Sequence, residues 1–173
     1  MIYLIRHGET DGNIHGGLRG SYFDDELNAK GHAQAKEVAK QLQGIDFDVV
    51  YCSPLKRTRQ TLAPIYSGKA IFEKRLMPRE YGETVGMTLE QALAFGLYCR
   101  ERNITPKNGE SFRDFENRIR AFLDEIKEKH EKQNVLVVTH ASICNMTKAI
   151  LDNFSSDREI YLTKNCEIIK IPN

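Results

Sequence analysis

The run of residues 135–138, Val-Leu-Val-Val, most constrains the fold of this chain, because it is apolar without interruption and rich in β-branched residues. Strands that are covered on both faces of a parallel sheet have this composition. The apolar runs 2–5 and 47–52 are too short for helices and predict two more buried strands. A last strand is expected over 166–171. These runs together predict a buried central sheet.

Segments with helical periodicity fill the sequence between these strands. Helices are expected from an N-cap at Asn28 to a point before Gly44, over 88–102, over 111–132 with Ser111 as N-cap, and from His140 through Leu151. The pair Ser53-Pro54 has the pattern of an N-cap followed by a proline at the first helical position, which predicts a helix directly after the second strand. Alternating strands and helices indicate an α/β fold, a three-layer α/β/α sandwich with a mostly parallel central sheet.

Charge and composition exclude several classes of protein. The 173 residues include 25 Lys and Arg against 24 Asp and Glu, a formal net charge of +1. A protein that binds nucleic acid along a basic face would carry a clear cationic excess, so no nucleic-acid partner is expected. We see no signal-like leader and no apolar run near the ~20 residues of a membrane helix, so we expect a cytoplasmic protein without membrane association. The four cysteines lack the paired spacing of zinc ligands.

Polar residues follow three of the predicted strands. Arg6 and His7 follow the first strand, Arg57 lies shortly after the second, and His140 follows the third. Ligand sites of open α/β sheets lie beyond the carboxyl ends of the strands, so these four side chains are expected to converge. Arginine presents a planar fork of donors that matches phosphate oxygens, and a neutral imidazole is a competent nucleophile. This pattern predicts a phosphate site.

Each of these residues also has an ordinary structural explanation. Arg57 is compatible with a solvated surface arginine, Arg6 with a salt bridge at a strand end, and His140 with a hydrogen-bonded core histidine. Arg57 falls in the first turn of a predicted helix, where the helix dipole disfavours a cation unless an anion is bound nearby. Taken together at three strand ends, the residues favour the phosphate site.

The motifs that contain these residues resemble the histidine phosphatase superfamily, which includes the cofactor-dependent phosphoglycerate mutases and many small phosphatases. The resemblance rests on Arg6-His7-Gly8-Glu9-Thr10 followed by Asn13, on Ser53-Pro54-Leu55-Lys56-Arg57-Thr58, on Gly109-Glu110-Ser111 and on Val137-Val138-Thr139-His140. It covers nearly the whole chain in the right order.

The resemblance implies a role for each matching residue. His7 would be the nucleophile that attacks phosphorus and forms a phosphohistidine. Arg6, Arg57 and His140 would bind the three equatorial oxygens, and Asn13 would add a neutral donor. Phosphoryl transfer is catalysed mainly by positioning and by complementary charge, so fixed cations can act without a metal ion or cofactor, and none is expected.

Three further residues are expected to bind substrate near this centre. The backbone N–H of Ala141, which opens the helix after the third strand, would direct a dipole toward an anion. Gly20 and Ser21 would lie at the wall of the pocket. The stretch after Gly20 is one residue longer than the family pattern, and Ala141 stands where a glycine is common. These departures leave the phosphate-binding core intact, and the resemblance therefore does not fix the shape of the loop or the identity of the substrate.

The sequence departs from the family at the residue that protonates the leaving oxygen. In the family this is usually a glutamate two residues after a leucine and four before a glycine. Here Leu76 and Gly82 mark that spacing, and Pro78 occupies the position of the acid. Glu80 is the preferred substitute, with Glu83 as the other carboxyl nearby, although a solvated loop carboxylate is an equally good explanation for Glu80. Without an acid in the pocket, substrates with good leaving groups would be preferred.

The expected protein is one histidine phosphatase-like domain over 1–173, with 76–108 as a lid-like insertion. Its expected reaction is metal-independent hydrolysis of the phosphomonoester of a small phosphorylated metabolite. Two alternatives stay open: mutase-type phosphoryl transfer, and a noncatalytic phosphate-binding module. The sequence sets no expectation for the oligomeric state. Four residues of the insertion could face an acidic group of the substrate: Arg79, Tyr81, Arg100 and Arg102.

Overall fold

A five-stranded sheet forms the centre of the computed structural model, which describes residues 1–154 and 162–173. The strands are β1 (Ile2–Arg6), β2 (Val49–Cys52), β3 (Ile71–Phe72), β4 (Val135–Thr139) and β5 (Ile168–Ile171), in the spatial order β3-β2-β4-β1-β5. β1, β2, β3 and β4 pair in parallel, and β5 pairs antiparallel with the edge of β1. The predicted mostly parallel sheet is confirmed.

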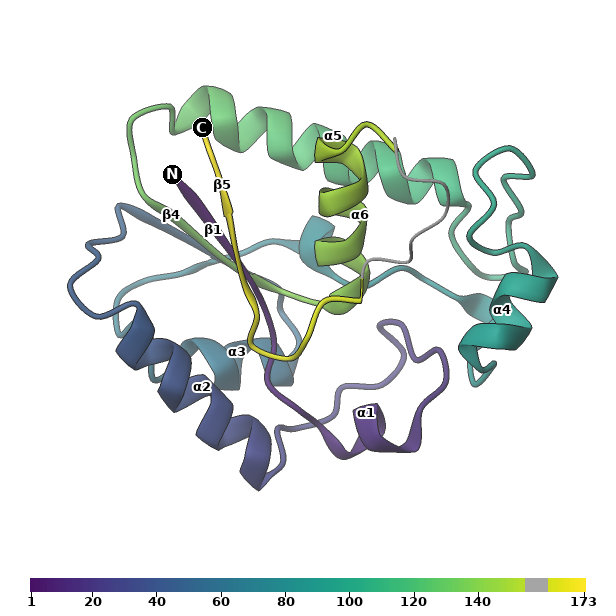
Figure 1. Cartoon of the computed structure of the whole chain (residues 1–173), viewed down its shortest axis with the longest axis horizontal. Helices are drawn as coiled ribbons and strands as arrows, with labels where there is room; N and C mark the ends of the chain where they lie inside the picture. Colours follow the sequence, from purple (N-terminus) through teal and green to yellow (C-terminus); the bar gives the residue numbers. More distant parts are fainter. Residues whose placement is uncertain (155–161) are drawn as a thin grey trace.

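Helices cover both faces of this sheet. They are α1 (Asp11–His15), α2 (Ala29–Gln41), α3 (Lys56–Leu62), α4 (Leu89–Phe95), α5 (Phe112–Lys129) and α6 (Ala141–Leu151), with short 3₁₀ turns over Lys74–Leu76 and Gly82–Thr84. Figure 1 shows α2 and α3 on one side of the strands and α5 and α6 on the other. The three-layer α/β/α arrangement is therefore also confirmed.

Side chains of β4 alternate between two hydrophobic clusters. Val135 and Val137 pack in the cluster that contains the buried residues of α5 and α6, and Leu136 and Val138 pack in the cluster with α2 and α3. All four side chains are fully buried. The uninterrupted apolar run arises because successive residues of a strand point to opposite faces and both faces are covered.

Two predicted helix starts are confirmed by their caps. The Asn28 side chain accepts a hydrogen bond from the Gly31 N–H at 2.8 Å, and the Ser111 hydroxyl accepts one from the Asp114 N–H at 3.0 Å. Side-chain acceptors at these positions satisfy N–H groups that have no partner within the helix. Among the described residues, no helix has the length and apolarity needed to cross a membrane.

The prediction that Ser53 and Pro54 begin a helix is wrong. α3 begins at Lys56, its N-cap residue is Leu55, and no side chain caps it. The Ser53 hydroxyl is instead hydrogen-bonded to His140, which lies 87 residues further along the chain. A tertiary hydrogen bond has replaced the local capping bond that the sequence pattern suggested.

Two further boundaries differ from expectation. The helix expected over 88–102 ends at Phe95, because Gly96 takes a left-handed conformation with φ of 89° that closes the helix. A short helix that the sequence did not predict, α1, follows the first strand, and its N-cap Thr10 forms a capping box with Asn13. The expected strands 47–52 and 166–171 begin two residues later than predicted.

The segment 76–108 has a small hydrophobic cluster of its own. Tyr81, Ala92 and Leu97 are buried in it, and Leu18 of the loop after α1 packs against them. Figure 1 shows α4, within this segment, beyond the carboxyl ends of β1 and β4. The segment therefore lies beside the strand ends where the candidate site is expected.

Candidate active site

The ends of β1, β2 and β4 meet through backbone hydrogen bonds. The His7 N–H donates to the Thr139 carbonyl at 2.9 Å, and the Ser53 N–H donates to the Val138 carbonyl at 3.0 Å. These bonds place the residues that follow the three strands at one edge of the sheet. Four of those predicted from the sequence line one cavity of about 1130 Å³: Arg6, His7, Arg57 and His140.

His7 is held as a neutral imidazole with one defined tautomer. Its Nδ1 lies 2.7 Å from the Gly8 carbonyl oxygen. A carbonyl can only accept a hydrogen bond, so Nδ1 carries the proton and the lone pair is on Nε2. Burial lowers the pKa of His7 well below its usual value, and the nearby Arg57 and Arg6 lower it further. His7 therefore has the protonation state that a nucleophile needs.

His140 lies beside His7, and both of its ring nitrogens have partners. The two imidazole rings stand edge to face, with their centroids 5.2 Å apart. The Arg57 Nε–H donates to His140 Nδ1 at 3.3 Å, which leaves the proton on Nε2, 2.8 Å from the Ser53 hydroxyl. Burial, followed by Arg57 and His7, lowers the pKa of His140 well below its usual value. The sequence pattern contained no signal for the contact with Ser53.

Two arginines bring positive charge to this cavity, and neither forms an ion pair with a carboxylate of the residues that the structure describes. Arg6 donates from Nη1 to the Thr163 carbonyl at 2.5 Å, and its buried Nε has no partner among the described residues. Arg57 is 6% exposed and donates to the carbonyls of Phe23 and Gly20 at 2.6 and 3.3 Å. Burial lowers the pKa of Arg57 to about 10. Buried charges without an ion-pair partner in contact are costly, so the site favours a bound anion.

Asn13 is oriented by two hydrogen bonds to its amide oxygen. The oxygen accepts from the Thr10 N–H at 3.1 Å and from Asn165 Nδ2 at 3.2 Å. Its NH₂ group is thereby left as the donor at the cavity that Asn13 lines. Asn165 also donates to the His7 carbonyl at 3.0 Å, a supporting contact that sequence reasoning missed.

The three other residues expected to bind substrate take different positions. Ala141 is the first residue of α6 and lines the cavity, as expected for a backbone donor beside an anion. Gly20 also lines it, with φ of 63° and an added Cβ only 3.0 Å from the Arg79 carbonyl, so a glycine suits this turn. Ser21 is not among the lining residues, and its hydroxyl donates to Glu80.

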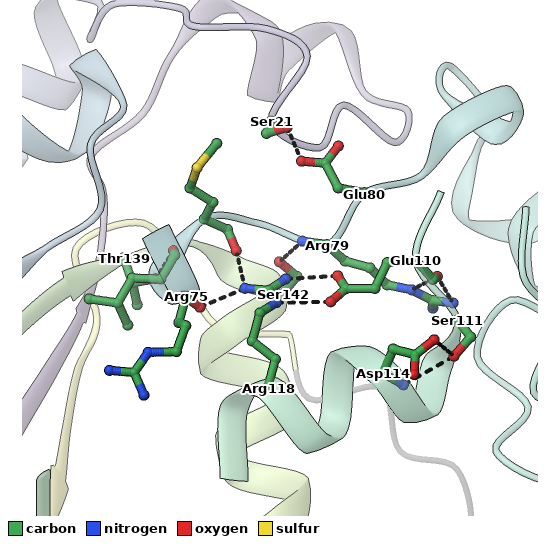
Figure 2. Close-up of polar contacts among 12 residues, drawn as sticks. Ser21, Arg75, Arg79, Glu80, Glu110, Ser111, Asp114, Arg118, Thr139 and Ser142 are labelled. Atoms are coloured by element: carbon green, nitrogen blue, oxygen red, sulfur yellow. Dashed lines mark hydrogen bonds and ion pairs between the residues drawn. The ribbon is translucent and has the colours of Figure 1, made fainter. Parts of the chain in front are cut away.

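Glu80 is directed to Ser21, as Figure 2 shows, and it does not line the cavity. Pro78 does line it, at the position where the family has its acid. Arg79 lines it as well, is 1% exposed, and donates to the carbonyls of Leu97 at 2.6 Å and Glu110 at 3.1 and 3.2 Å. Of residues 78–80, therefore, Pro78 and Arg79 line the cavity and Glu80 does not.

The two buried histidines are expected to make the protein less stable below pH 6.5. Both have a lowered pKa in the folded state, whereas in the unfolded chain a histidine takes up its proton near pH 6.5. Between these values the unfolded state binds more protons, so the free energy of unfolding falls as the pH falls, by up to about 1.4 kcal/mol per pH unit for each histidine. Urea denaturation between pH 7.5 and 5 measures this slope.

The matched variant for this slope carries His7→Asn and His140→Asn. Its free energy of unfolding is expected to change less between pH 6.5 and 5 than that of the wild type. An equal slope in the two proteins would show that other groups cause the pH dependence.

The chain matches the family model of the histidine phosphatase superfamily (branch 1) over residues 2–171. It is 34% identical over 148 residues to phosphoserine phosphatase 1 of Hydrogenobacter thermophilus, covering 80% of this chain and 70% of the relative. It is 29% identical to the 2,3-bisphosphoglycerate-dependent phosphoglycerate mutase of Bartonella bacilliformis, covering 90% and 83%. The crystal structure of the alpha-ribazole phosphatase from Shigella flexneri superposes with a TM-score of 0.74 at 28% identity, covering 87% of this chain and 78% of that one.

The fold and the four converging side chains define an enzyme of the phosphatase and mutase type. The chain belongs to branch 1 of the histidine phosphatase superfamily, as the resemblance of its motifs implied. Its relatives include several proteins named as phosphatases, and it is a histidine phosphatase-type phosphatase.

Proposed function

We propose that this protein is a metal-independent phosphomonoesterase that acts on a small phosphorylated metabolite through a phosphohistidine intermediate. The observation that carries the proposal is the state of His7. Its Nδ1–H donates to the Gly8 carbonyl, so the unprotonated Nε2 is available for attack. Arg6 and Arg57 lie beside it, and neither has a carboxylate partner among the described residues.

The proposed first step is attack of His7 Nε2 on phosphorus as the P–O bond to the leaving group breaks; the leaving oxygen keeps the electron pair of that bond and takes a proton from solvent water. Arg6 and Arg57 stabilise the charge on the equatorial oxygens, and the Asn13 amide adds a neutral donor. Because Nδ1 donates to a carbonyl, the imidazole keeps its orientation as it becomes positively charged. Water then attacks the phosphohistidine, the P–N bond breaks, and Nε2 recovers its electron pair.

Hydrolysis is preferred over mutase-type transfer because the cavity is large, about 1130 Å³, and partly open to solvent. A mutase must retain its substrate and keep water away while the phosphoryl group returns to a second hydroxyl. We assign the chain to one domain over 1–173. Within it we assign only the segment 76–108 as a lid that could keep water from the substrate. Mutase-type transfer is the second candidate, supported by the named mutase among the relatives.

The test is phosphate release from a broad panel of phosphorylated metabolites in the presence of a chelator. We expect turnover of at least part of the panel, and an acid-labile phosphoenzyme when the reaction is quenched early. No phosphate release from any substrate would contradict the phosphatase proposal, and binding of phosphate without labelling or turnover would instead support a phosphate-binding module. Transfer to a second hydroxyl at a rate above hydrolysis would favour the mutase.

A further inference from the structure

The carboxylates near the leaving-group side of the cavity already have strong partners. Glu80 accepts a hydrogen bond from the Ser21 hydroxyl. Both carboxylate oxygens of Glu110 accept hydrogen bonds from Arg118, at 2.8 and 2.7 Å (Figure 2). Glu83 accepts from the Lys107 N–H at 3.1 Å. None of these three carboxylates lines the cavity.

The acidic groups that line the cavity are engaged as well. Asp25 forms a two-nitrogen ion pair with Arg19 at distances of 2.7 to 3.1 Å, and the exposed Glu101 accepts from the Cys99 thiol. Burial raises the pKa of the Tyr81 phenol well above its usual value, which makes it a weaker acid. Pro78 lines the cavity at the position of the family acid, and the nearby carboxylates Glu80 and Glu83 do not line it.

One wall of the cavity beyond the phosphate site is apolar. Leu89 and Leu93 of α4 line this wall. Both apolar side chains are unusually exposed, at 39% and 46%. Phe112, Met146 and Phe154 line the same cavity from α5, from α6 and from the turn after it. Exposed leucines beside the buried Phe112 and the partly buried Phe154 indicate a surface that an apolar ligand would cover.

Two of the arginines on this side of the cavity have partners within the protein. Arg79 donates to the carbonyls of Leu97 and Glu110, and Arg100 forms an ion pair with Glu116 at 2.8 Å and lies over the Phe154 ring. All four residues that the sequence suggested could face an acidic group of the substrate line the cavity: Arg79, Tyr81, Arg100 and Arg102. The lining offers apolar surface to the leaving group.

We propose that the substrates of this enzyme are aryl phosphates, that is, phosphate monoesters of phenols with an apolar aromatic body. The inference rests on the proposed function and adds the chemistry of the leaving group. A phenol has a pKa of about 10, whereas an aliphatic alcohol is close to water at about 15.7. A phenolate therefore leaves without a proton from the enzyme, and the apolar wall accommodates its ring.

The reaction then proceeds without an enzyme acid in its first step. His7 Nε2 forms a bond to phosphorus as the P–O bond to the aryl oxygen breaks, and the electron pair of that bond leaves on oxygen as phenolate. The phenolate takes its proton from solvent water. In the second step water attacks phosphorus, its proton passes to solvent, and the P–N electron pair returns to Nε2.

The main experiment compares phenyl phosphate with cyclohexyl phosphate, which are similar in size and apolarity and differ in leaving-group pKa. We expect kcat/KM to be larger for phenyl phosphate by about 10²- to 10⁴-fold, the contribution of a general acid that this site lacks. Across substituted phenyl phosphates, log kcat/KM should fall steadily as the leaving-group pKa rises. Rates for the phenyl and cyclohexyl esters within tenfold of each other would overturn the inference.

The same panel separates failure of the inference from failure of the proposed function. A tenfold or greater preference for phosphoserine or 3-phosphoglycerate over phenyl phosphate would contradict the aryl class and leave the phosphatase intact. Absence of phosphate release from every ester would contradict the phosphatase itself. Glu80→Gln should show the same leaving-group dependence as the wild type, and a loss confined to the cyclohexyl ester would identify Glu80 as the acid.

A variant pair on α4 tests the apolar wall. Leu93→Asp places a charge in the lining, and Phe95→Asp places one on an exposed residue of the same helix that does not line the cavity. We expect Leu93→Asp to lower kcat/KM for 1-naphthyl phosphate by about tenfold or more, from lost apolar burial, without changing inhibition by inorganic phosphate. Equal effects of the two variants would contradict an apolar subsite at α4.

Discussion

Replacing His7 by asparagine is expected to lower kcat/KM by roughly 10⁵-fold, the scale for loss of a nucleophile in covalent catalysis. This corresponds to about 7 kcal/mol of transition-state stabilisation at about 1.36 kcal/mol per tenfold change. Asparagine has no nucleophilic lone pair that can replace that of Nε2. The substitution also removes the imidazole N–H that donates to the Gly8 carbonyl. Phosphate release from an activated ester and acid-labile labelling of the enzyme measure the two consequences.

The control for this variant is His32→Asn, which makes the same substitution at an exposed histidine of α2. It should retain the turnover and the labelling of the wild type. Circular dichroism and urea denaturation at pH 7.5 establish that the His7 variant is folded. A folded His7→Asn enzyme that still forms an acid-labile phosphoenzyme would place the nucleophile elsewhere.

The sheet and its two helical layers could be predicted because their signals are local. The run 135–138 is apolar at every residue, and the structure buries alternate side chains against opposite helical layers. The Asn28 and Ser111 side chains each accept a hydrogen bond from the N–H three residues further along, so the local sequence contains both partners. Such elements depend on propensity and periodicity, which a single sequence displays.

The convergence of the candidate site was also predictable, because parallel strands bring their carboxyl ends to one edge. Residues far apart in sequence, such as His7 and His140, therefore meet once the strand order is known. The hydrogen bonds that orient these side chains were not predictable. Ser53 has the local pattern of a helix cap, and its contact with His140 depends on the register of β2 and β4.

Supporting residues from the end of the chain lacked a signal for a related reason. Asn165 contacts Asn13 across 152 positions, and Arg6 reaches the Thr163 carbonyl across 157 positions. Polar residues in a loop have no periodicity, and a backbone carbonyl carries no side-chain identity at all. The direction of Glu80 was equally hidden, because a carboxylate in a loop is free to turn toward either side until the packing is known.

Replacing Arg57 by methionine is expected to lower kcat/KM by about 10³-fold, the scale for loss of a cation that stabilises the transferring phosphoryl group. The guanidinium is buried, its Nη groups are fixed by the carbonyls of Phe23 and Gly20, and its Nε is fixed by His140. Arg57→Lys keeps a charge and loses the fork, so we expect an intermediate rate. Steady-state kinetics on an activated ester measure all three proteins.

The matched control is Arg59→Met, which removes the same charge from the exposed side of the same helix. It should leave kcat/KM within a few-fold of the wild type, because salt screens the charge of a solvent-exposed side chain. A comparable loss in both variants would mean that the general positive potential of α3 matters and that the position of Arg57 does not.

Binding of inorganic phosphate gives an independent measure of the same guanidinium. A ligand that binds only the folded state stabilises it by about 2.7 kcal/mol at one hundred times its Kd. Phosphate should therefore raise the Tm of the wild type and of Arg59→Met, and should do so much less for Arg57→Met. The buried charge of Arg57 is costly while its partners are neutral carbonyls and an imidazole, so the variant without phosphate is expected to lose little stability. A stabilisation by phosphate that persists in Arg57→Met would show that Arg6 and the backbone donors hold the anion without it.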